Sequence, residues 1–569
     1  MNSSVDPCVD FYNYACGNWP EIHPLPVGAH SWIMRMISER ETKQKVEEML
    51  KKDSRDDEMS SVKVTKQWYK ACMNTDDMNK RGMKPLLFTL NKIGGWPIIM
   101  ARNKGNRSYE KWQNIDDYYA HLTGYNLLHD VRVSAYGRNT KVLSVVIDVP
   151  NMPQYSWMLE ELPENENETE SSSLGGSKFR VDEKYRKFIK KIVSSVAKAE
   201  GFNVPKVQLE EDIDDLLNFT WKLTKITTLM DDYVNMTIRD FQNWYNDLEP
   251  RTEHSMVNWE GKIIGIFKES GIDLSNDTTI KIVSPGYFEK LVPLLDESSS
   301  RTIVNYLHWN FLSSAIKMTT DKMRVLCEQM TGDDTGKQSR SDACIEEAQM
   351  SDVIAYEYMR RYFNNGTIKL ALDALSDMEK EMEIEIGQSN WASKEIQNLA
   401  LRRVKSIKKN IGYPDWYNNA TIMENYFGAL TMGSTYFENA LRLQRYYKLR
   451  ELWLLRHKNE VKPWLVDPLT LNAFYLSESN SITMPLVNLQ SPFFSGTQLN
   501  LINYALTGYL LAHELYHPFD ELKRLFNEHG DEIHWPKTMT DEYYKRAQCF
   551  VQQFNEYTLD GTISGPKIE

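Results

Sequence analysis

The amino-acid sequence predicts a mainly α-helical protein with a small β component, divided into two or more domains. Its 569 residues are too many for one compact hydrophobic core. Apolar residues recur at helical spacing through most of the stretch from residue 181 to residue 410. A β-branched, alternating pattern that predicts a strand is found at residues 141–149. With 41% hydrophobic and 26% charged residues, the composition is that of an ordinary globular protein.

The other elements follow from the same patterns, taken in chain order. Apolar periodicity predicts helices at residues 34–52, 62–80, 185–199, 208–230 and 346–364. Residues 161–178 are acidic, rich in serine and nearly free of large apolar side chains, so we expect a solvated loop there. Thr331–Ser341 is a second polar interruption, and we expect it to be a loop as well.

The charge balance limits the kinds of partner. A net charge of −12 argues against nucleic acid. The most basic helical stretch, Arg442–Lys458, has leucines at helical spacing, which favours a solvated basic face above a buried apolar stripe. No apolar run approaches the roughly 18 residues of a membrane-spanning helix. The sequence therefore predicts membrane association only through an anchor outside it, and it predicts no oligomeric state.

Two features are typical of the secretory pathway. Sequons for N-glycosylation occur at Asn2, Asn106, Asn167, Asn218, Asn235, Asn276, Asn365 and Asn419. The six cysteines are scattered, which suits long-range disulfides better than a thiolate metal site. We therefore expect an extracellular or cell-surface ectodomain whose targeting segment lies outside this sequence.

The chemistry is concentrated in the pattern His-Glu-x-x-His at residues 513–517. On a helix, His513 and His517 lie on one face about one turn apart, where two imidazoles can bind one Zn²⁺. Glu514 then lies beside the metal, where it can take a proton from a zinc-activated water. The alternative is a core helix whose histidines happen to fall four apart. The motif favours the zinc site.

The flanking residues predict the limits of this helix. Ser495 and Gln498 have the spacing of a capping box at its start, and Pro518 is expected to end it. A third zinc ligand is not found close by: Asp520 and Lys523 stand where a metzincin has glycine and histidine. A more distant ligand is required.

Short segments along nearly the whole chain, from Cys8–Trp19 through Gly94–Pro97 to Ile411–Asp415, resemble those of neprilysin and the endothelin-converting enzymes, peptidase family M13. The resemblance implies a thermolysin-like zincin catalytic domain facing a large helical lid domain. It places an N-terminal segment, packed on the catalytic domain, at residues 1–59. The lid would then be at residues 60–415 and the catalytic domain at residues 416–569.

The same resemblance implies a substrate site. Asn472 and Ala473 match an edge strand that hydrogen-bonds an extended peptide, and strand addition of this kind is independent of the peptide's sequence. Residues matching the S1′ pocket are Asn488, Phe493, Tyr509 and Leu510. Asn488 and Tyr509 are larger and more polar than is usual in the family, which suggests a narrower or more polar pocket. Pro518 replaces a usual glycine and alters the backbone geometry at His517.

The resemblance also suggests that the chain is a fragment lacking the C-terminal part. The family's third zinc ligand belongs to a Glu-Asn-x-x-Asp segment, and Glu569, at the chain end, is a candidate for that glutamate. Cys72 is implied to pair with Cys344. Cys8, Cys16 and Cys549 match cysteines whose partners would lie in the missing part, whereas Cys327 has no counterpart.

Together these observations predict a zinc metalloendopeptidase that hydrolyses small extracellular peptides, with Zn²⁺ as cofactor and Glu514 as general base. An alternative is a catalytically inactive ectodomain that binds peptides or partners without hydrolysis, which the missing third ligand favours. A zinc aminopeptidase is a weaker alternative, because no exopeptidase motif accompanies the helix.

Overall fold

The computed structural model describes residues 1–26, 31–101, 110–134, 143–161, 179–229, 232–330, 339–457, 464, 466–477, 479–529, 531–555, 558–559 and 563–564. The chain forms two compact units, each built from separate stretches of sequence. Unit 1 comprises Met1–Trp32, Leu50–Gln349 and Glu424–Lys462. Unit 2 comprises Ile33–Met49, Met350–Met423 and Pro463–Glu569.

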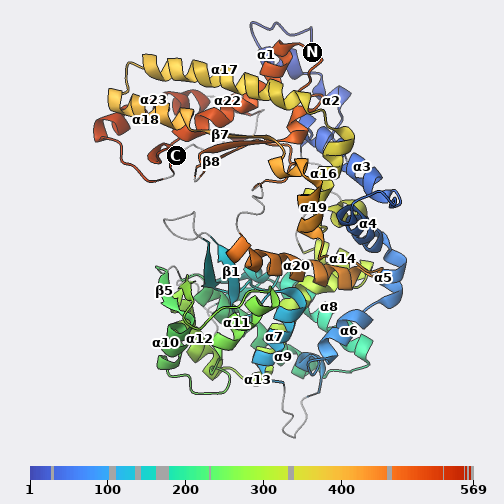
Figure 1. Cartoon of the computed structure of the whole chain (residues 1–569). Coiled ribbons are helices and arrows are strands. Elements are labelled where there is room, and N and C mark those ends of the chain that lie inside the picture. Colours follow the sequence, from blue (N-terminus) through green and yellow to red (C-terminus); the bar gives the residue numbers. More distant parts are fainter. Residues whose placement is uncertain are drawn as a thin grey trace. The chain divides into compact units, whose positions relative to one another are not determined.

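Unit 1 is a helical body with a small sheet (Figure 1). Its helices are α1 (Phe11–Cys16), α2 (Trp19–Ile22), α4 (Ser60–Met73), α5 (Thr75–Arg81), α6 (Lys84–Asn91), η1 (Pro97–Ile99), α7 (Trp112–Thr123), η2 (Ser156–Met158), α8 (Glu183–Glu200), α9 (Lys206–Thr227), α10 (Ile238–Asp247), α11 (Trp259–Glu269), α12 (Pro285–Glu297), α13 (Ser300–Ala315), η3 (Ile316–Met318), α14 (Asp321–Glu328), α15 (Arg340–Glu346) and α20 (Tyr436–His457). Its strands are β1 (Asp130–Ser134), β2 (Ser144–Asp148), β3 (Leu159–Glu161), β4 (Phe179–Val181), β5 (Val234–Thr237) and β6 (Thr279–Ile282).

The larger sheet of unit 1 has the order β1-β2-β6-β5. β2 pairs antiparallel with β1 and parallel with β6, so that Ile147 faces Val131 on one side and Ile282 on the other. All three of these side chains are buried. The β-branched run predicted at residues 141–149 is thus the inner strand β2, because branched side chains pack well on a buried pleated surface.

Helix α13 of unit 1 is buried almost all round. Such a helix needs apolar or hydrogen-bonded residues on every face. Trp309 stacks on Trp96 with ring centroids 6.4 Å apart, and its indole N–H donates to the Tyr185 hydroxyl at 3.1 Å. His308, also on α13, is 2.7 Å through Nδ1 from the Tyr119 hydroxyl.

Unit 2 holds the His-Glu-x-x-His motif. Its elements are α3 (Met34–Lys51), α16 (Ser351–Tyr362), α17 (Gly366–Gln388), α18 (Lys394–Lys405), β7 (Lys408–Gly412), η4 (Asp415–Asn418), α19 (Ala420–Phe427), β8 (Phe474–Leu476), β9 (Ser481–Pro485), η5 (Leu486–Leu489), α21 (Asn500–Asn503), η6 (Tyr504–Gly508), α22 (Tyr509–Tyr516), η7 (His517–Phe519), η8 (Lys523–Leu525), α23 (Lys537–Asn555), β10 (Thr558–Leu559) and β11 (Ile563–Ser564). Helices α3 and α19 each extend across a boundary between the units.

The sheet of unit 2 has the order β7-β9-β8, with β9 parallel to β7 and antiparallel to β8. Figure 1 shows α17, α18 and α22 gathered around it. The buried core joins these helices to the sheet through residues such as Leu375, Val404, Ile482, Leu511 and Leu515. Residues 350–423 therefore belong with the motif in one compact unit, although the sequence suggested consecutive blocks. The domain limits at residues 59 and 415 stay predictions.

Most predicted helices are present, with two corrections. The prediction for residues 34–52 corresponds to α3, that for residues 185–199 to α8 and that for residues 208–230 to α9. The helix predicted at residues 62–80 is wrong as one element, because Asn74 ends α4 and its side chain accepts a hydrogen bond from the Asp77 N–H to begin α5.

The second correction concerns residues 331–364. The helix predicted at residues 346–364 is interrupted between α15 and α16, where Gln349 has a positive φ of 47° that an α-helix excludes. The end of the predicted Thr331–Ser341 loop is helical, since Ser339 caps α15 by accepting from the Asp342 N–H. Residues 331–338, like most of the predicted loop at 161–178, lie outside the described residues.

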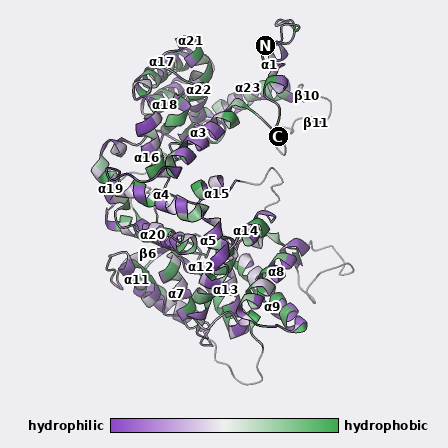
Figure 2. Cartoon of the chain, turned by 90° about the vertical axis from the view of Figure 1, so that its right-hand side faces the viewer, coloured by the Kyte–Doolittle hydropathy of each residue, from purple (hydrophilic) through white to green (hydrophobic). Residues whose placement is uncertain are grey.

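Figure 2 shows hydrophilic and hydrophobic residues interleaved along the helices. Among the described residues, no helix combines the length and apolar character needed to cross a membrane. Cys72 and Cys344 form a disulfide within unit 1, as the family resemblance implied. Cys8, Cys16 and Cys549 are exposed thiols, and Cys327 is a buried one.

Two buried histidines predict acid sensitivity for unit 1. Burial lowers the pKa of His129 to about 4 and that of His308 to about 3. Between these values and about pH 6.5 the unfolded chain binds more protons than the folded one, so stability falls as the pH falls through this window. From about pH 7.5 to about pH 5, each histidine should lower the free energy of unfolding by roughly 2 kcal/mol.

Denaturant unfolding followed by tryptophan fluorescence at both pH values measures this loss. His129→Phe should remove about half of it, because the His129 ring packs on Trp259 without a hydrogen bond from either nitrogen to any described residue. His121→Gln, at a histidine whose side chain is 60% exposed, is the matched control. An unchanged pH dependence in His129→Phe would contradict the assignment.

Candidate functional site

The motif lies on a continuous helical stretch from Asn500 to Phe519. It passes from α21 through one π-helical turn, η6, into α22, and ends in the 3₁₀ turn η7. The predicted capping box is wrong: Leu499 precedes the first turn, and no side chain caps it. Asn503 instead ties the preceding loop to the helix, because its amide donates to the Ser495 carbonyl at 2.9 Å and its oxygen accepts from the Ser495 N–H at 3.1 Å.

His513, Glu514 and His517 bring their ligand atoms together on one side of this helix. A donor atom from each residue lies within 4.8 Å of the others. The two imidazole rings have centroids 4.6 Å apart and are nearly perpendicular, at 85°. Glu514 Oε2 lies 3.9 Å from His517 Nε2. The helical spacing therefore produces the cluster that the sequence predicted.

The opposite face of α22 fixes the direction of this cluster. Leu511 and Leu515 are both buried in the core of unit 2. They precede His513 and His517 by two positions each, and two positions turn a helix by about 200°. Burial of the leucines therefore directs the histidines away from the core, where they can bind a ligand.

Glu514 is only 3% exposed although it adjoins the exposed His513. Burial raises the pKa of its carboxyl, against the lowering effect of the two histidines and Lys523. Its Oε2 atom has no hydrogen-bond partner among the described residues. A buried carboxylate oxygen without a donor is costly. Two imidazoles beside such an oxygen fit a zinc ion with a bound water, which supplies both positive charge and a donor.

Asp520 orients the second histidine. Its Oδ2 lies 3.2 Å from His517 Nδ1, which leaves Nε2 free on the side of His513 and Glu514. A metal-ligating histidine usually holds a carboxylate on its other nitrogen in this way. Pro518 changes the helix to a 3₁₀ turn at His517, as expected for the end of α22, and this turn lies between His517 and Asp520. The sequence alone did not indicate this role of Asp520.

A cavity of about 270 Å³ lies between the motif and strand β8. Its walls include Asn472 and Ala473 as well as His513, Glu514 and His517. β8 is an edge strand: it pairs with β9 on one side, and no strand of the described residues pairs with its other side. An edge strand beside a metal cluster can bind an extended chain by main-chain hydrogen bonds.

The other predicted substrate residues differ in position. Leu510 lines the cavity, whereas Phe493 does not, so the substrate role of Phe493 stays a prediction. Tyr509 is 71% exposed. Asn488 is buried, and its amide donates to the carbonyls of Thr470, Asn472 and Pro485. The polarity of Asn488 is thus used to hold the segment before β8, and the suggestion of a narrower or more polar pocket stays a prediction.

Two cationic residues of the site were missed by the sequence analysis. Lys523 lines the cavity, with its ammonium 3.5 Å from Asp520 Oδ2 and 5.5 Å from the centre of the Tyr475 ring. Arg403, on α18, is 1% exposed. Its guanidinium donates to the carbonyls of Pro518, Lys523 and Phe526 and to the Tyr475 hydroxyl.

Arg403 therefore joins the turn after the motif to the edge strand. One nitrogen of the guanidinium holds three carbonyls from two turns of chain and the other holds the Tyr475 hydroxyl, and the single ammonium of a lysine could not make both contacts. Nothing in the residues around Arg403 distinguishes it from the other arginine of this helix. Its role depends on contacts with residues more than 100 positions away in the chain.

The family comparisons agree with this geometry. Sequence models of peptidase family M13 match residues 7–414 and residues 472–565. The chain therefore belongs to peptidase family M13, and it is a zinc-dependent metalloendopeptidase by class. The family membership that the sequence resemblance implied is confirmed.

Relatives match along nearly the whole chain. Membrane metallo-endopeptidase-like 1 of Mus musculus is 24% identical over 574 residues, which cover 98% of this chain and 73% of that protein. Neprilysin of Homo sapiens is 24% identical, and the match covers 98% of this chain and 75% of that protein. Neprilysin-11 of Caenorhabditis elegans is 24% identical, with 99% and 66% covered.

Solved structures share the fold. The crystal structure of PepO from Lactobacillus rhamnosis superposes with a TM-score of 0.70 at 16% identity, covering 97% of this chain and 82% of that one. The zinc metalloprotease Zmp1 of Mycobacterium tuberculosis, in complex with an inhibitor, superposes with a TM-score of 0.63 at 16% identity. The match covers 98% of this chain and 80% of that one. The predicted mainly α zincin fold is confirmed.

The contact between Asp520 and His517 predicts an effect on metal affinity. Asp520→Asn should weaken zinc binding by about 10–100-fold, because the imidazole loses its carboxylate partner. Competition with a chromogenic chelator measures the affinity. Glu521→Gln, at the next residue, whose carboxylate accepts from the Tyr544 hydroxyl, is the matched control. Equal affinities in Asp520→Asn and wild type would refute the orienting role.

Proposed function

We propose that the chain hydrolyses short peptides with zinc held by His513 and His517 and with Glu514 as general base. The observation that carries the proposal is the convergence of these three donor groups within 4.8 Å beside β8, the edge strand of the sheet. Family membership supports a third ligand from elsewhere in the protein. Glu569, the sequence-based candidate for that ligand, lies outside the described residues.

In this mechanism the protein's own groups bind the peptide and move the proton. The outer side of β8 pairs with the peptide main chain, and Asn472 and Ala473 directly precede that strand in the cavity wall. Zinc, when bound, supplies a Lewis acid that lowers the pKa of a water molecule. Glu514 accepts the proton from this water and delivers it to the departing amine. Its burial supports this role, because a raised pKa brings a carboxyl nearer to the working pH.

Lys523 supports a preference among substrates. Its ammonium is held at the cavity wall by Asp520, and the Tyr475 ring covers one side of it. Asp520 also faces His517, so it neutralises Lys523 only in part. We propose that an acidic side chain or terminal carboxylate of the peptide is favoured near Lys523.

The wider setting of the proposal comes from the sequence. The sequons and the Cys72–Cys344 disulfide support an extracellular or cell-surface location and peptides found there as substrates. A lid at residues 60–415 would restrict the site to short peptides. The alternative, an inactive ectodomain that binds peptides, shares the fold and differs in the absence of hydrolysis.

Substitutions in the motif can distinguish the general base, Glu514, from the zinc ligand His513. In a zinc-loaded protein, Glu514→Gln should keep its zinc and lose about 10²–10⁴-fold in kcat, because only the proton acceptor is removed. His513→Ala should lose both zinc and activity, because a ligand is deleted. Elemental analysis and cleavage of a quenched-fluorescence peptide library measure the two properties. Hydrolysis that persists in Glu514→Gln would refute the assignment of the base, and a zinc-loaded wild type without hydrolysis would favour the inactive alternative.

Lys523 predicts a change in selectivity. Lys523→Met should lower kcat/KM for peptides with an acidic residue near the cleaved bond by about three- to tenfold relative to neutral peptides, since one partly solvated ion pair is lost. Lys545→Met, at a lysine whose side chain is 78% exposed on α23, is the control. A uniform fall for all peptides would show that Lys523 acts on the fold of the turn and not on the substrate.

A further inference from the structure

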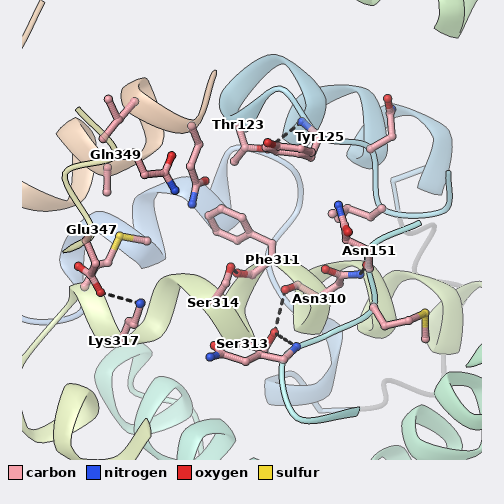
Figure 3. Close-up of a pocket in the computed structure, with 18 of the residues that line it drawn as sticks. Thr123, Tyr125, Asn151, Asn310, Phe311, Ser313, Ser314, Lys317, Glu347 and Gln349 are labelled. Atoms are coloured by element: carbon pink, nitrogen blue, oxygen red, sulfur yellow. Dashed lines mark hydrogen bonds and ion pairs between the residues drawn. The ribbon is translucent and has the colours of Figure 1, made fainter. Parts of the chain in front are cut away.

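A feature that the proposed chemistry does not use is a cavity inside unit 1. It has a volume of about 530 Å³, which is within the usual range for small-ligand sites. Its walls come from α4, α7, α13, α20 and the segments around residues 151 and 349. Figure 3 shows Phe311 near its middle, with Tyr125 on one side and Asn310 and Ser314 on the other.

The cavity carries no free charge at its described walls. Its ionic residues, Lys317 and Glu347, pair with each other at 2.6 Å. The second Glu347 oxygen accepts from the Tyr436 hydroxyl. A charged ligand would have to break this pair or remain unpaired in a partly enclosed site, which is unfavourable. The cavity therefore suits an uncharged ligand.

Its walls are unusually rich in side-chain amides. Asn151, Gln154, Gln349 and Gln444 line the cavity, and no hydrogen bond to their side chains is present within the described part of the chain. Asn126, a fifth amide in the wall, is 6% exposed. Its nitrogen donates to Asp116, but its oxygen has no donor among the described residues. The wall thus holds both donors and acceptors that the protein does not pair.

The aromatic residues of the cavity do not offer an open face. Phe311 is 5% exposed and stacks on Tyr119 with centroids 4.4 Å apart. Trp68 is 1% exposed. The Tyr125 ring has the Lys448 ammonium over it, at 5.0 Å from the centroid. Stacking of a sugar or nucleobase ring needs an accessible aromatic face, so these ligands are disfavoured.

We propose that this cavity of unit 1 binds a short, uncharged, extended peptide segment. A side-chain amide carries an N–H donor and a carbonyl acceptor, as a peptide bond does. It can therefore donate to a main-chain carbonyl or accept from a main-chain N–H. Met152 in the same wall is partly exposed and gives an apolar surface for an aliphatic side chain. This site is separate from the zinc motif in sequence and in unit, and it does not depend on hydrolysis.

The test is photo-crosslinking to the full chain in a Glu514→Gln background. The probe is acetyl-Ala-Gln-Bpa-Ser-amide, in which Bpa is the photoreactive residue benzoylphenylalanine, and mass spectrometry maps the crosslinks. We expect crosslinks at the cavity methionines Met152 and Met318. Crosslinks on residues 472–476 would show binding at the edge strand beside the zinc motif. Loss of binding at the unit 1 cavity can therefore be told apart from loss of binding at the zinc site.

A cavity-filling variant and a matched control give the decisive comparison. Ser314 is exposed at the cavity wall, and its hydroxyl donates to a carbonyl of its own helix. Ser314→Trp should reduce the crosslinks at Met152 and Met318 by at least tenfold. Ser195→Trp, at a serine on α8 that makes the same kind of bond, should leave them unchanged. Undiminished crosslinks in Ser314→Trp would overturn the proposal.

Competition defines the class of ligand. Unlabelled acetyl-Ala-Gln-Leu-Ser-amide should displace the probe at least tenfold better than the same peptide with glutamate for glutamine. Maltose should not displace it. Stronger displacement by maltose or by the charged peptide would overturn the proposal. If Ser314→Trp does not fold, the pair Gln349→Leu and Gln444→Leu decides: at least a tenfold loss of crosslinking supports the proposal, and less than a twofold loss overturns it.

Discussion

The burial of Leu511 and Leu515 under α22 is the interaction on which the site depends. These two side chains pack into the core that joins α17, α18 and the β7-β9-β8 sheet. Because a helix is rigid over two turns, burial of one face sets the direction of His513 and His517 on the other. The same packing brings α22 beside β8, so that the histidines and this edge strand face one cavity.

Arg403 and Asp520 complete the arrangement from beyond the helix. The helix ends at Tyr516, and a following turn without support would leave His517 at a fraying terminus. Arg403 holds three carbonyls of that turn and the Tyr475 hydroxyl, and Asp520 holds the imidazole. The site is thus positioned by groups that are buried or paired, which limits the motion of the ligand atoms.

Local sequence patterns were sufficient to predict many of the helices and the motif, but they could not predict contacts between distant residues. Periodicity predicted α22 and the juxtaposition of its histidines, since both depend only on helical geometry. It did not predict the start of the helix, because Asn503 holds the Ser495 loop where a capping box was expected. Gln349 interrupts a predicted helix through a backbone angle with no residue signal. Arg403 is 115 residues from Pro518 in the chain, and only the tertiary fold brings them together.

The proposed zinc site has two imidazole ligands, His513 on α22 and His517 at the start of η7, and Glu514 remains outside the ligand set. Zinc K-edge absorption spectroscopy of the zinc-loaded chain tests it most directly. We expect two imidazole ligands at about 2.0–2.1 Å, with one lost in His513→Ala and none lost in Glu514→Gln. Scattering from sulfur at about 2.3 Å, or a spectrum unchanged in His513→Ala, would contradict it.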